Sequence, residues 1–481
     1  MKPLCMKRIL MLLTLLAEAW NASAKVTLPE QICDNMVLQQ NASVRLWGWA
    51  DPHAAVHVAA SWDSSADATC DDAGHWEVRL ATPAGSYEPQ RVTISDGEIA
   101  VLDNVLIGEV WLAGGQSNME MPLDGFYNCP VLGANEAIAR ADARRDRIRY
   151  VKIPHAAAYE PQDRVAGAWR CLTARTAPEM SAVGYFYAEM LNDVLGVPVG
   201  IIDCTWGGTL VEAWCDRATL EAYPDVDLNR EAIGKLNPMK KPMMMYNAMV
   251  HPLSSYTVRG FIWYQGESNV VSPATYGERF TRMVSLWRRM WGEGDLPFYF
   301  VEIAPCTYYG DARGDRSAFL REQQCKALEM IPASGMVSTN DLVASYEQAN
   351  IHPANKHDVG RRLAFLALNR TYGMETVACE SPRMRSVEFA DGRAVVTLSP
   401  VKGGYNRMSG IEGFEICGSD GAFHPAEVSI DGSLRLIVSS PEVPEPTAVR
   451  YCFRNFQIGN LADSRGLPLV PFRTDDFPPA D

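Results

Sequence analysis

The residue of this chain best placed to do chemistry is a serine on a glycine-rich turn. The sequence Gly-Gly-Gln-Ser-Asn at 114–118 directly follows the apolar run 105–113. A turn of this kind at the end of a strand presents the serine hydroxyl above a sheet, and the amides of the turn can stabilise an oxyanion. Gly-x-Ser turns also occur in ordinary loops, but the position after a strand makes Ser117 a candidate nucleophile.

Two more apolar runs end in turns that carry polar or small residues. One gives Thr-Trp-Gly-Gly-Thr at 205–209, and the other gives Trp-Tyr-Gln-Gly-Glu-Ser-Asn at 263–269. Glycines in such turns let the backbone approach a ligand closely. We expect all three turns to meet at one cleft, where Trp206, Trp263 and Glu267 would line the substrate side. Trp214 is a further aromatic near this cleft.

A serine hydroxyl needs a base to take its proton. Of the eight histidines, only His352 and His357 lie in the loop after the last apolar run of the α/β region. Pro353 fixes the loop at His352, whereas His357 would lie near the start of the following helix. We therefore expect His352 to be the general base.

The acid that would orient His352 is ambiguous, because Ala349 and Asn350 cannot supply a carboxylate. Asp341 follows the last strand directly and is the first choice, since a strand end is more rigid than a loop. The alternatives are Glu347, Glu267 and a backbone carbonyl, the last of which would give a Ser-His dyad.

The elements that position these residues read as an α/β domain. The five apolar runs are separated by helical stretches such as 276–290 and 313–330, a pattern typical of a parallel sheet covered on both faces. Active sites of such sheets lie beyond the carboxyl ends of the strands. The five expected strands are 105–113, 197–204, 258–264, 298–303 and 336–339.

Both flanks of this domain alternate polar and apolar residues in short runs, which predicts antiparallel strands. They form either one module split by the α/β domain or two separate ones. The predicted division is a signal peptide at 1–24, an N-terminal β-domain at 25–104, the catalytic domain at 105–375 and a C-terminal β-rich domain at 376–481.

The first residues predict export. Lys2, Lys7 and Arg8 precede the apolar run 9–17, and Ala-Ser-Ala at 22–24 provides a cleavage site. This pattern is typical of a secretory signal peptide. We expect a secreted or periplasmic protein cleaved near Ala24, without membrane insertion, since no later apolar stretch reaches about 20 residues.

The net charge of −14, with 21% charged residues, argues against nucleic acid or an anionic membrane as the partner. The 12 cysteines are scattered, with no Cys-x-x-Cys pair and no Cys/His cluster at metal spacing. We therefore expect no metal and no cofactor, and most cysteines are expected to be buried small hydrophobes.

Taken together, the motifs strongly resemble those of the sialate O-acetylesterase family, carbohydrate esterases of the SGNH-hydrolase group. The resemblance extends over nearly the whole mature chain. It is carried by residues 34–39, 115–119, 206–208, 263–269, 351–356, 466–468 and 471–475.

This resemblance implies a flavodoxin-like α/β/α domain with a parallel sheet, flanked by β-sandwich-like parts, and metal-independent hydrolysis of acetyl esters. Ser117 would be the nucleophile and would donate its own amide to the oxyanion. Gly208 would supply a second amide, and Gln265 would stand where the wider group has an oxyanion-hole asparagine. His352 would be the base.

The expected substrate is an acetylated sugar or glycan, with O-acetylated sialic acids favoured. Acetylated xylan or another plant glycan is the nearest alternative. A catalytically inactive carbohydrate-binding protein on the same fold is an alternative of another class, disfavoured because a binder needs neither Ser117 nor His352. A serine peptidase is disfavoured because the resemblance points to ester-cleaving enzymes.

Overall fold

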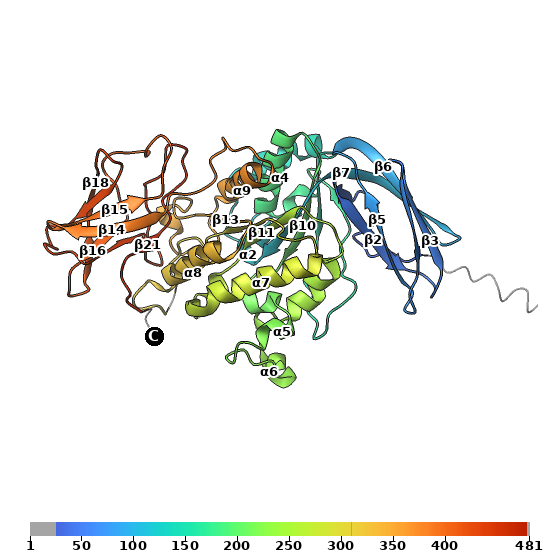
Figure 1. Ribbon diagram of the computed structural model, residues 1–481, viewed down its shortest axis with the longest axis horizontal. Coiled ribbons are helices and arrows are strands. Elements are labelled where there is room, and N and C mark those ends of the chain that lie inside the picture. The colour runs from blue at the N-terminus through green and yellow to red at the C-terminus, as the bar shows by residue number, and fades with distance from the viewer. Residues whose placement is uncertain (1–25, 309, 479–481) are drawn as a thin grey trace, which may run out of the picture.

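The structure is a computed structural model that describes residues 26–308 and 310–478. The predicted signal peptide at 1–24 lies outside the described residues. Figure 1 shows an α/β domain in the middle, with the N-terminal β-rich part at one end and the C-terminal β-rich part at the other. The two flanking β parts are therefore separate modules in space.

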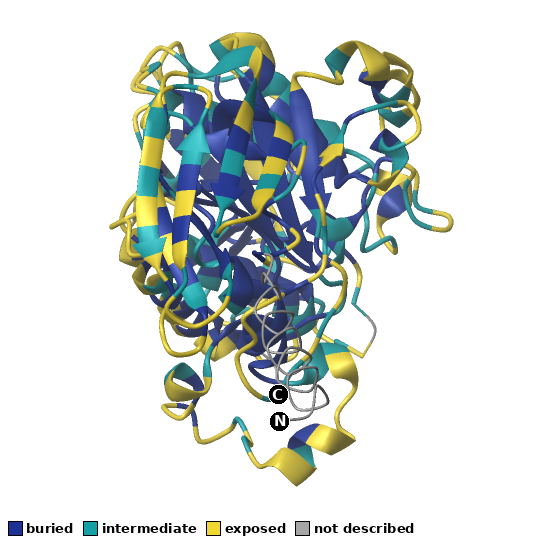
Figure 2. Cartoon of the chain, turned by 90° about the vertical axis from the view of Figure 1, so that its right-hand side faces the viewer, coloured by how far each residue is buried: buried dark blue, intermediate teal, exposed yellow. Residues whose placement is uncertain are grey.

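The N-terminal part is built mainly from antiparallel strands with one buried face, and its first strand, β1, instead pairs in parallel with β7. In β5, Trp76, Val78 and Leu80 are buried while Glu77 and Arg79 are exposed, and Figure 2 shows the same alternation along the strands of this end. β2 pairs with β5, and β3 pairs with β4 and β6. The strands are β1 (Val37–Gln39), β2 (Ser43–Trp49), β3 (Ala55–Ala60), β4 (Ser64–Thr69), β5 (His75–Ala81) and β6 (Ser86–Ser95).

One long strand, β7 (Ile99–Gly115), connects this part to the α/β domain. Its first half pairs with β6 in an antiparallel ladder, and its second half pairs in parallel with strands of the central sheet. The predicted division between residues 104 and 105 therefore falls inside a continuous strand.

The central sheet has the order β13-β12-β11-β7-β10-β8-β9. All neighbours from β13 to β8 are parallel, and the edge strand β9 is antiparallel to β8. This confirms the predicted α/β class and all five predicted strands, and it adds β8 and β9, which the sequence analysis missed. The further strands are β8 (Ile148–Lys152), β9 (Arg170–Cys171), β10 (Val199–Thr205), β11 (Gly260–Tyr264), β12 (Phe298–Val301) and β13 (Ser334–Val337).

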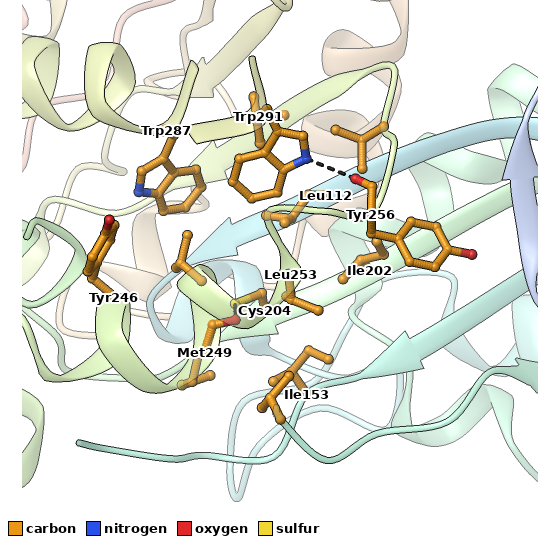
Figure 3. Packing of buried hydrophobic residues seen from close by; sticks show 14 of the residues in the cluster. Leu112, Ile153, Ile202, Cys204, Tyr246, Met249, Leu253, Tyr256, Trp287 and Trp291 are labelled. Atoms are coloured by element: carbon orange, nitrogen blue, oxygen red, sulfur yellow. Dashed lines mark hydrogen bonds between the residues drawn. The ribbon is translucent and has the colours of Figure 1, made fainter. Parts of the chain in front are cut away.

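Helices cover both faces of this sheet because its buried strands present apolar side chains alternately to each side. Phe261 packs in one core with α7 and α8, whereas its neighbour Ile262 packs in the other with α4 and α9. Figure 3 shows the first core, in which the Trp291 indole N–H donates to the Tyr256 carbonyl over 2.9 Å. The helices are α2 (Ser117–Glu120), α3 (Ala134–Arg140), α4 (Ala182–Leu195), α5 (Arg217–Leu220), α6 (Arg230–Lys235), α7 (Tyr276–Trp291), α8 (Arg316–Met330) and α9 (Lys356–Leu366).

The C-terminal part consists of two four-stranded antiparallel sheets with the orders β14-β15-β19-β18 and β17-β16-β20-β21. Val396 and Leu436 of the first sheet share a core with Ile416 and Val449 of the second, so the part is a β-sandwich. Its strands are β14 (Met384–Ala390), β15 (Arg393–Leu398), β16 (Phe414–Cys417), β17 (Phe423–Pro425), β18 (Glu427–Ile430), β19 (Leu436–Ser439), β20 (Ala448–Tyr451) and β21 (Phe472–Arg473).

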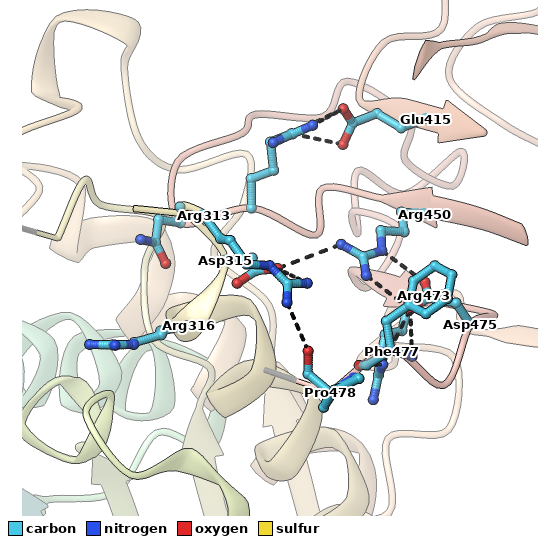
Figure 4. Close-up of polar contacts among 12 residues, drawn as sticks. Arg313, Asp315, Arg316, Glu415, Arg450, Arg473, Asp475, Phe477 and Pro478 are labelled. Carbon is cyan, nitrogen blue, oxygen red and sulfur yellow. Dashed lines mark hydrogen bonds and ion pairs between the residues drawn. The ribbon is translucent and has the colours of Figure 1, made fainter. Parts of the chain in front are cut away.

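Ion pairs and hydrogen bonds fix this sandwich to the α/β domain around the start of α8 (Figure 4). Arg450 of β20 pairs with Asp315, the residue before α8, and with Asp475. Arg473 of β21 pairs with Glu322 of α8 over 2.9 Å. These side chains are mostly buried, so their charge-assisted bonds are shielded from solvent.

Within residues 26–308 and 310–478, no helix is long and apolar enough to cross a membrane. The eleven cysteines in this part of the chain are all unpaired, and five of them are only partly buried. No cluster of three or more histidine, cysteine or acidic side chains suited to a metal ion occurs among the same residues.

Candidate active site

Ser117 lies at the carboxyl edge of the central strand of the sheet. It begins the short helix α2 immediately after β7. The turn before it is bonded to both neighbouring strand ends, because Gln116 N donates to the Tyr264 carbonyl and Trp206 N donates to the Gly115 carbonyl, each over 3.0 Å. The three predicted turns therefore meet at one place.

The second turn lies directly against the serine. A Cβ atom added to Gly207 would come within 3.2 Å of the Ser117 Cβ, so any larger residue there would require its neighbours to shift by a few tenths of an ångström. The Glu120 carboxylate accepts the Gly207 amide over 2.5 Å, and Gly208 adopts a φ of +75°. Gly207 therefore packs against Ser117, and Gly208 is the next residue of the same turn.

The loop that carries His352 contacts the serine turn through residues adjacent in sequence to Ser117 and His352. Asn118 Nδ2, one residue after Ser117, donates to the carbonyl of Ile351, one residue before His352, over 2.9 Å. Asn350 brackets His352 by accepting its amide N–H and donating to its carbonyl, each over 2.9 Å. The ring of Phe126 lies edge-on to the His352 ring, with 5.2 Å between centroids.

The surroundings of His352 favour its neutral form. Burial lowers the pKa of His352 to about 4, the positive charge of Lys356 acts in the same direction, and the negative charge of Glu120 opposes both. A neutral imidazole can accept a proton, as a base must. His357, the other histidine of the loop, instead bonds to Asp358 and packs against Phe186.

The expected orienting acids all have other partners. Both oxygens of Asp341 bind the guanidinium of Arg362, over 2.8 and 2.6 Å. The Glu347 oxygens accept the amides of Ala344 and Ala354. In the described part of the chain, no carboxylate hydrogen-bonds to the His352 ring. Asp341 was the first choice, but the hydrogen bonds of its carboxylate in the structure go to Arg362, so its role as the orienting acid stays a prediction.

Gln265 also differs from its expected role as an oxyanion donor facing the cleft. Its side chain is fully buried, and its amide nitrogen donates to Thr209 O over 3.0 Å and to Asn269 Oδ1 over 2.8 Å. A side-chain amide has only two N–H donors. Gln265 therefore holds the 205–209 turn in place rather than offering a free donor.

The expected substrate-side residues are divided by burial. Trp263 is 1% exposed and packs edge-on to Trp214 and Trp287, so it belongs to the hydrophobic core rather than to the cleft. Glu267 is also buried and accepts Asn118 Nδ2. Trp206 remains partly exposed and stacks flat on His155, with 4.5 Å between ring centroids.

Sequence reasoning missed four residues of this site: Asn118, Glu120, His155 and Lys356. Glu120 was discoverable, since it lies three residues after Ser117 on the same helical turn. His155 follows β8, and because that strand was overlooked, the histidine was not connected with a strand end. Its Nε2 lies 2.7 Å from Glu120 Oε1, so this pair flanks the serine beside the 205–209 turn.

Comparison with known sequences bears directly on this site. The family described as "Carbohydrate esterase, sialic acid-specific acetylesterase" matches residues 107–369, more than half of the chain and the segment that holds Ser117, Gly208, Gln265 and His352. The chain belongs to this family. Membership of this carbohydrate esterase family identifies the chain as an ester hydrolase.

Individual members of the carbohydrate esterase family extend the match beyond the catalytic domain. Human sialate O-acetylesterase is 28% identical over 403 residues, covering 76% of this chain and 75% of the relative. The mouse sialate O-acetylesterase is 27% identical over 508 residues, covering 91% and 92%. A solved carbohydrate acetylesterase from Xanthomonas citri superposes with a TM-score of 0.84 at 37% identity, covering 94% of this chain and all of that one. Hydrolysis of sugar acetyl esters is the activity that these comparisons support.

Proposed function

We propose that the chain removes O-acetyl groups from sialic acids by acyl transfer, with Ser117 as nucleophile and His352 as general base. The observation that carries this proposal is the bond from Asn118 to Ile351, because it joins the two loops one residue away from each of these side chains. Family membership supports the ester substrate, and the relatives named as sialate O-acetylesterases support the sugar.

In the first half of the reaction, a ring nitrogen of His352 takes the Ser117 proton while the serine oxygen bonds to the acetyl carbonyl carbon. The backbone amides of Ser117 and Gly208 hold the resulting oxyanion. The imidazolium then gives its proton to the sugar oxygen as the bond from that oxygen to the acetyl carbon breaks.

In the second half, His352 takes a proton from water as the water oxygen attacks the acetyl-serine. Acetate leaves, and Ser117 regains its proton from the imidazolium. The negative charge of Glu120 opposes the lowering of the His352 pKa, so Glu120 stabilises the imidazolium that forms in both halves. We propose a Ser-His dyad for this chain, without a carboxylate bonded to His352.

The predicted leader at 1–24 supports export, and we propose that the mature enzyme acts outside the cytoplasm on glycans or free sugars. Detection of a mature N-terminus near Lys25 in the exported fraction would test this part of the proposal. A product that stays in the cytoplasm at full length would contradict it.

Two variants test the catalytic assignment. Ser117→Ala and His352→Ala should abolish acetate release while the thermal midpoint stays near that of the parent, because each removes one group of the acyl-transfer pair. The matched controls are Ser285→Ala, an α7 serine bonded only to Thr281 O, and His357→Ala. A serine-directed phosphonate should label Ser117, and labelling of another serine would overturn the assignment.

Specificity is tested separately with a panel of substrates. The parent enzyme is given O-acetylated sialic acids and acetylated xylo-oligosaccharides at equal ester concentration, and acetate release is measured. We expect a higher kcat/KM on the sialic acids. A preference for the xylo-oligosaccharides would leave the acyl-transfer mechanism intact and reassign the substrate to plant glycans.

A further inference from the structure

A buried lysine that the acyl-transfer mechanism does not use lies beneath the proposed catalytic pair. Lys356, at the start of α9, has no exposed surface. Its ammonium group donates to Asn118 Oδ1 over 2.9 Å and to the carbonyl of Pro353 over 2.6 Å. Asn118 follows Ser117 in the chain, and Pro353 follows His352, so one ammonium group holds the neighbours of both.

The chemistry of the partners fixes the orientation of the Asn118 side chain. An ammonium group only donates, so the amide atom facing Lys356 is the oxygen. A carboxylate and a carbonyl only accept, so the amide nitrogen faces Glu267 Oε1 over 2.5 Å and Ile351 O over 2.9 Å. The Asn118 side chain uses both its N–H donors and accepts one bond on its oxygen, with partners from the 263–269 turn and from the 351–356 stretch.

We propose that Lys356 is a positioning residue that acts through Asn118 to set the distance between Ser117 and His352. This inference rests on the proposed function. Two bonds of less than 3 Å connect the serine turn to the histidine loop through a single atom, Lys356 Nζ. Removing that atom leaves the Asn118 carbonyl oxygen without its donor, and the two segments then keep only the bond from Asn118 to Ile351 as their link through Asn118. A misplacement of about 1 Å in a catalytic pair can reduce the rate on the order of 10²-fold.

Charge gives Lys356 a second effect on the same pair. Burial lowers the pKa of Lys356 to about 7, and the nearby charges of Glu267 and Glu347, with Cys129, oppose this. The positive charge in turn contributes to lowering the pKa of His352, which Glu120 on α2 opposes. Lys356 is therefore protonated below about pH 7 and loses its proton as the pH rises through that value, which weakens its bond to Asn118.

Replacing Lys356 separates positioning from stability. Exchanging a buried charged group for an apolar one of similar size often leaves stability unchanged or raises it, provided that no partner charge is left alone. A residue with a purely structural role would instead lower the thermal midpoint together with the activity. The two roles therefore predict different combinations of kcat and thermal midpoint.

The test compares Lys356→Met with Lys326→Met, an exposed lysine on α8 paired with Glu322. In Lys356→Met we expect kcat on acetyl esters to fall on the order of 10²-fold with KM within about twofold. We expect the parent to lose kcat above about pH 7, as Lys356 loses its proton, and we expect this loss to be absent in Lys356→Met. Lys326→Met should match the parent in all three measurements.

The double variant Lys356→Met/Glu267→Gln does not leave the Glu267 charge without the Lys356 cation. It is measured in the same way, so the test can still be made if Lys356→Met alone does not fold. A parent-like kcat and an unchanged pH profile in either folded variant would overturn the inference. If the Lys356 variants are parent-like but Ser117→Ala and His352→Ala are inactive in the same assay, only the inference about Lys356 fails and the proposed function stands. If those two variants keep their activity, the proposed function itself fails.

Discussion

Two buried glutamates at opposite edges of the parallel sheet have contrasting surroundings. Glu109, where β7 enters the parallel sheet, accepts two bonds from Arg259 and one each from Tyr372, Gln39 and Gln40. Glu267, at the carboxyl edge, accepts one bond from Asn118, and its second oxygen has no partner among the described residues.

This difference separates a carboxylate that serves the fold from one that serves the site. A buried charge with all its hydrogen bonds satisfied stabilises its surroundings, whereas an undersatisfied one costs free energy and is retained for another reason. Accordingly, burial raises the pKa of Glu267. Substitutions at the amino edge should change stability, and substitutions at the carboxyl edge should change turnover.

The largest expected effect is on stability at the amino edge. Glu109→Leu leaves Arg259 without its anion and should lower the free energy of unfolding by about 3–5 kcal/mol, measured by urea denaturation. The kcat per folded molecule should stay within about twofold of the parent. Glu136→Leu, at an exposed ion pair with Arg140, is the control and should change stability by no more than about 0.5 kcal/mol.

The reverse pattern is expected for Glu267→Gln. A neutral amide can still accept the Asn118 bond but removes the anion near Lys356, so kcat should fall about tenfold, a loss of the size seen when supporting groups of a site are changed. Because the raised pKa of Glu267 makes its charged form unfavourable in the fold, the parent loses stability as the pH rises above the ordinary value of 4.5. The free energy of unfolding of Glu267→Gln should not fall with pH in this way. A steeper fall in the variant than in the parent would contradict the contrast drawn between Glu109 and Glu267.

The pH dependence of the parent tests the surroundings of His352. Because only the neutral ring acts as base, kcat/KM should rise with pH through about 4 and then stay level up to about pH 7, above which Lys356 loses its proton. Glu120 opposes the lowering of this pKa, so Glu120→Gln should move the acidic limb to lower pH. An acidic limb at the ordinary histidine value near 6.5 would show that His352 is more open to water than the structure indicates.

The smallest effect is expected for Asp341→Asn. Since Arg362 occupies both oxygens of Asp341, its replacement should reduce kcat by less than about tenfold, measured on the same acetyl ester. A loss of several powers of ten would instead indicate an orienting acid of the kind found in serine-protease triads. Asp431→Asn, at a partly exposed aspartate paired with Arg435, is the matched control.

The strands of the central sheet could be predicted because buried parallel strands are continuous apolar runs with small or polar residues at their ends. The run at 258–264 is an example, with β11 found at Gly260–Tyr264. β8 was missed because it has Arg149 and Lys152 in an otherwise apolar segment. Arg149 is nevertheless fully buried and is bonded to the carbonyl of Asn35, a contact from a distant part of the chain that no local pattern reveals.

At the site, the positions of Ser117 and His352 beyond the strand ends could be predicted from the sequence because each follows an apolar run. The direction in which the side chains after a strand point could not be predicted from the sequence. Trp263 and Gln265 alternate with Tyr264 along one strand end, and whether each faces the core or the cleft depends on helices packed from elsewhere, such as α7 with Trp287. The partners of Asp341 and Lys356 likewise come from distant segments, so sequence proximity was a poor guide to them.

The continuity of β7 has a consequence for protein engineering. The same strand pairs with β6 of the N-terminal part and forms the centre of the catalytic sheet. The catalytic domain therefore cannot be excised at residue 105 without cutting this strand. A shortened chain starting at residue 105 would lack β1 and β6, would expose the β7 positions that pair with them, and would begin inside a hydrogen-bonded ladder. Fusion partners or purification tags are therefore better attached before Val26 than at the predicted boundary.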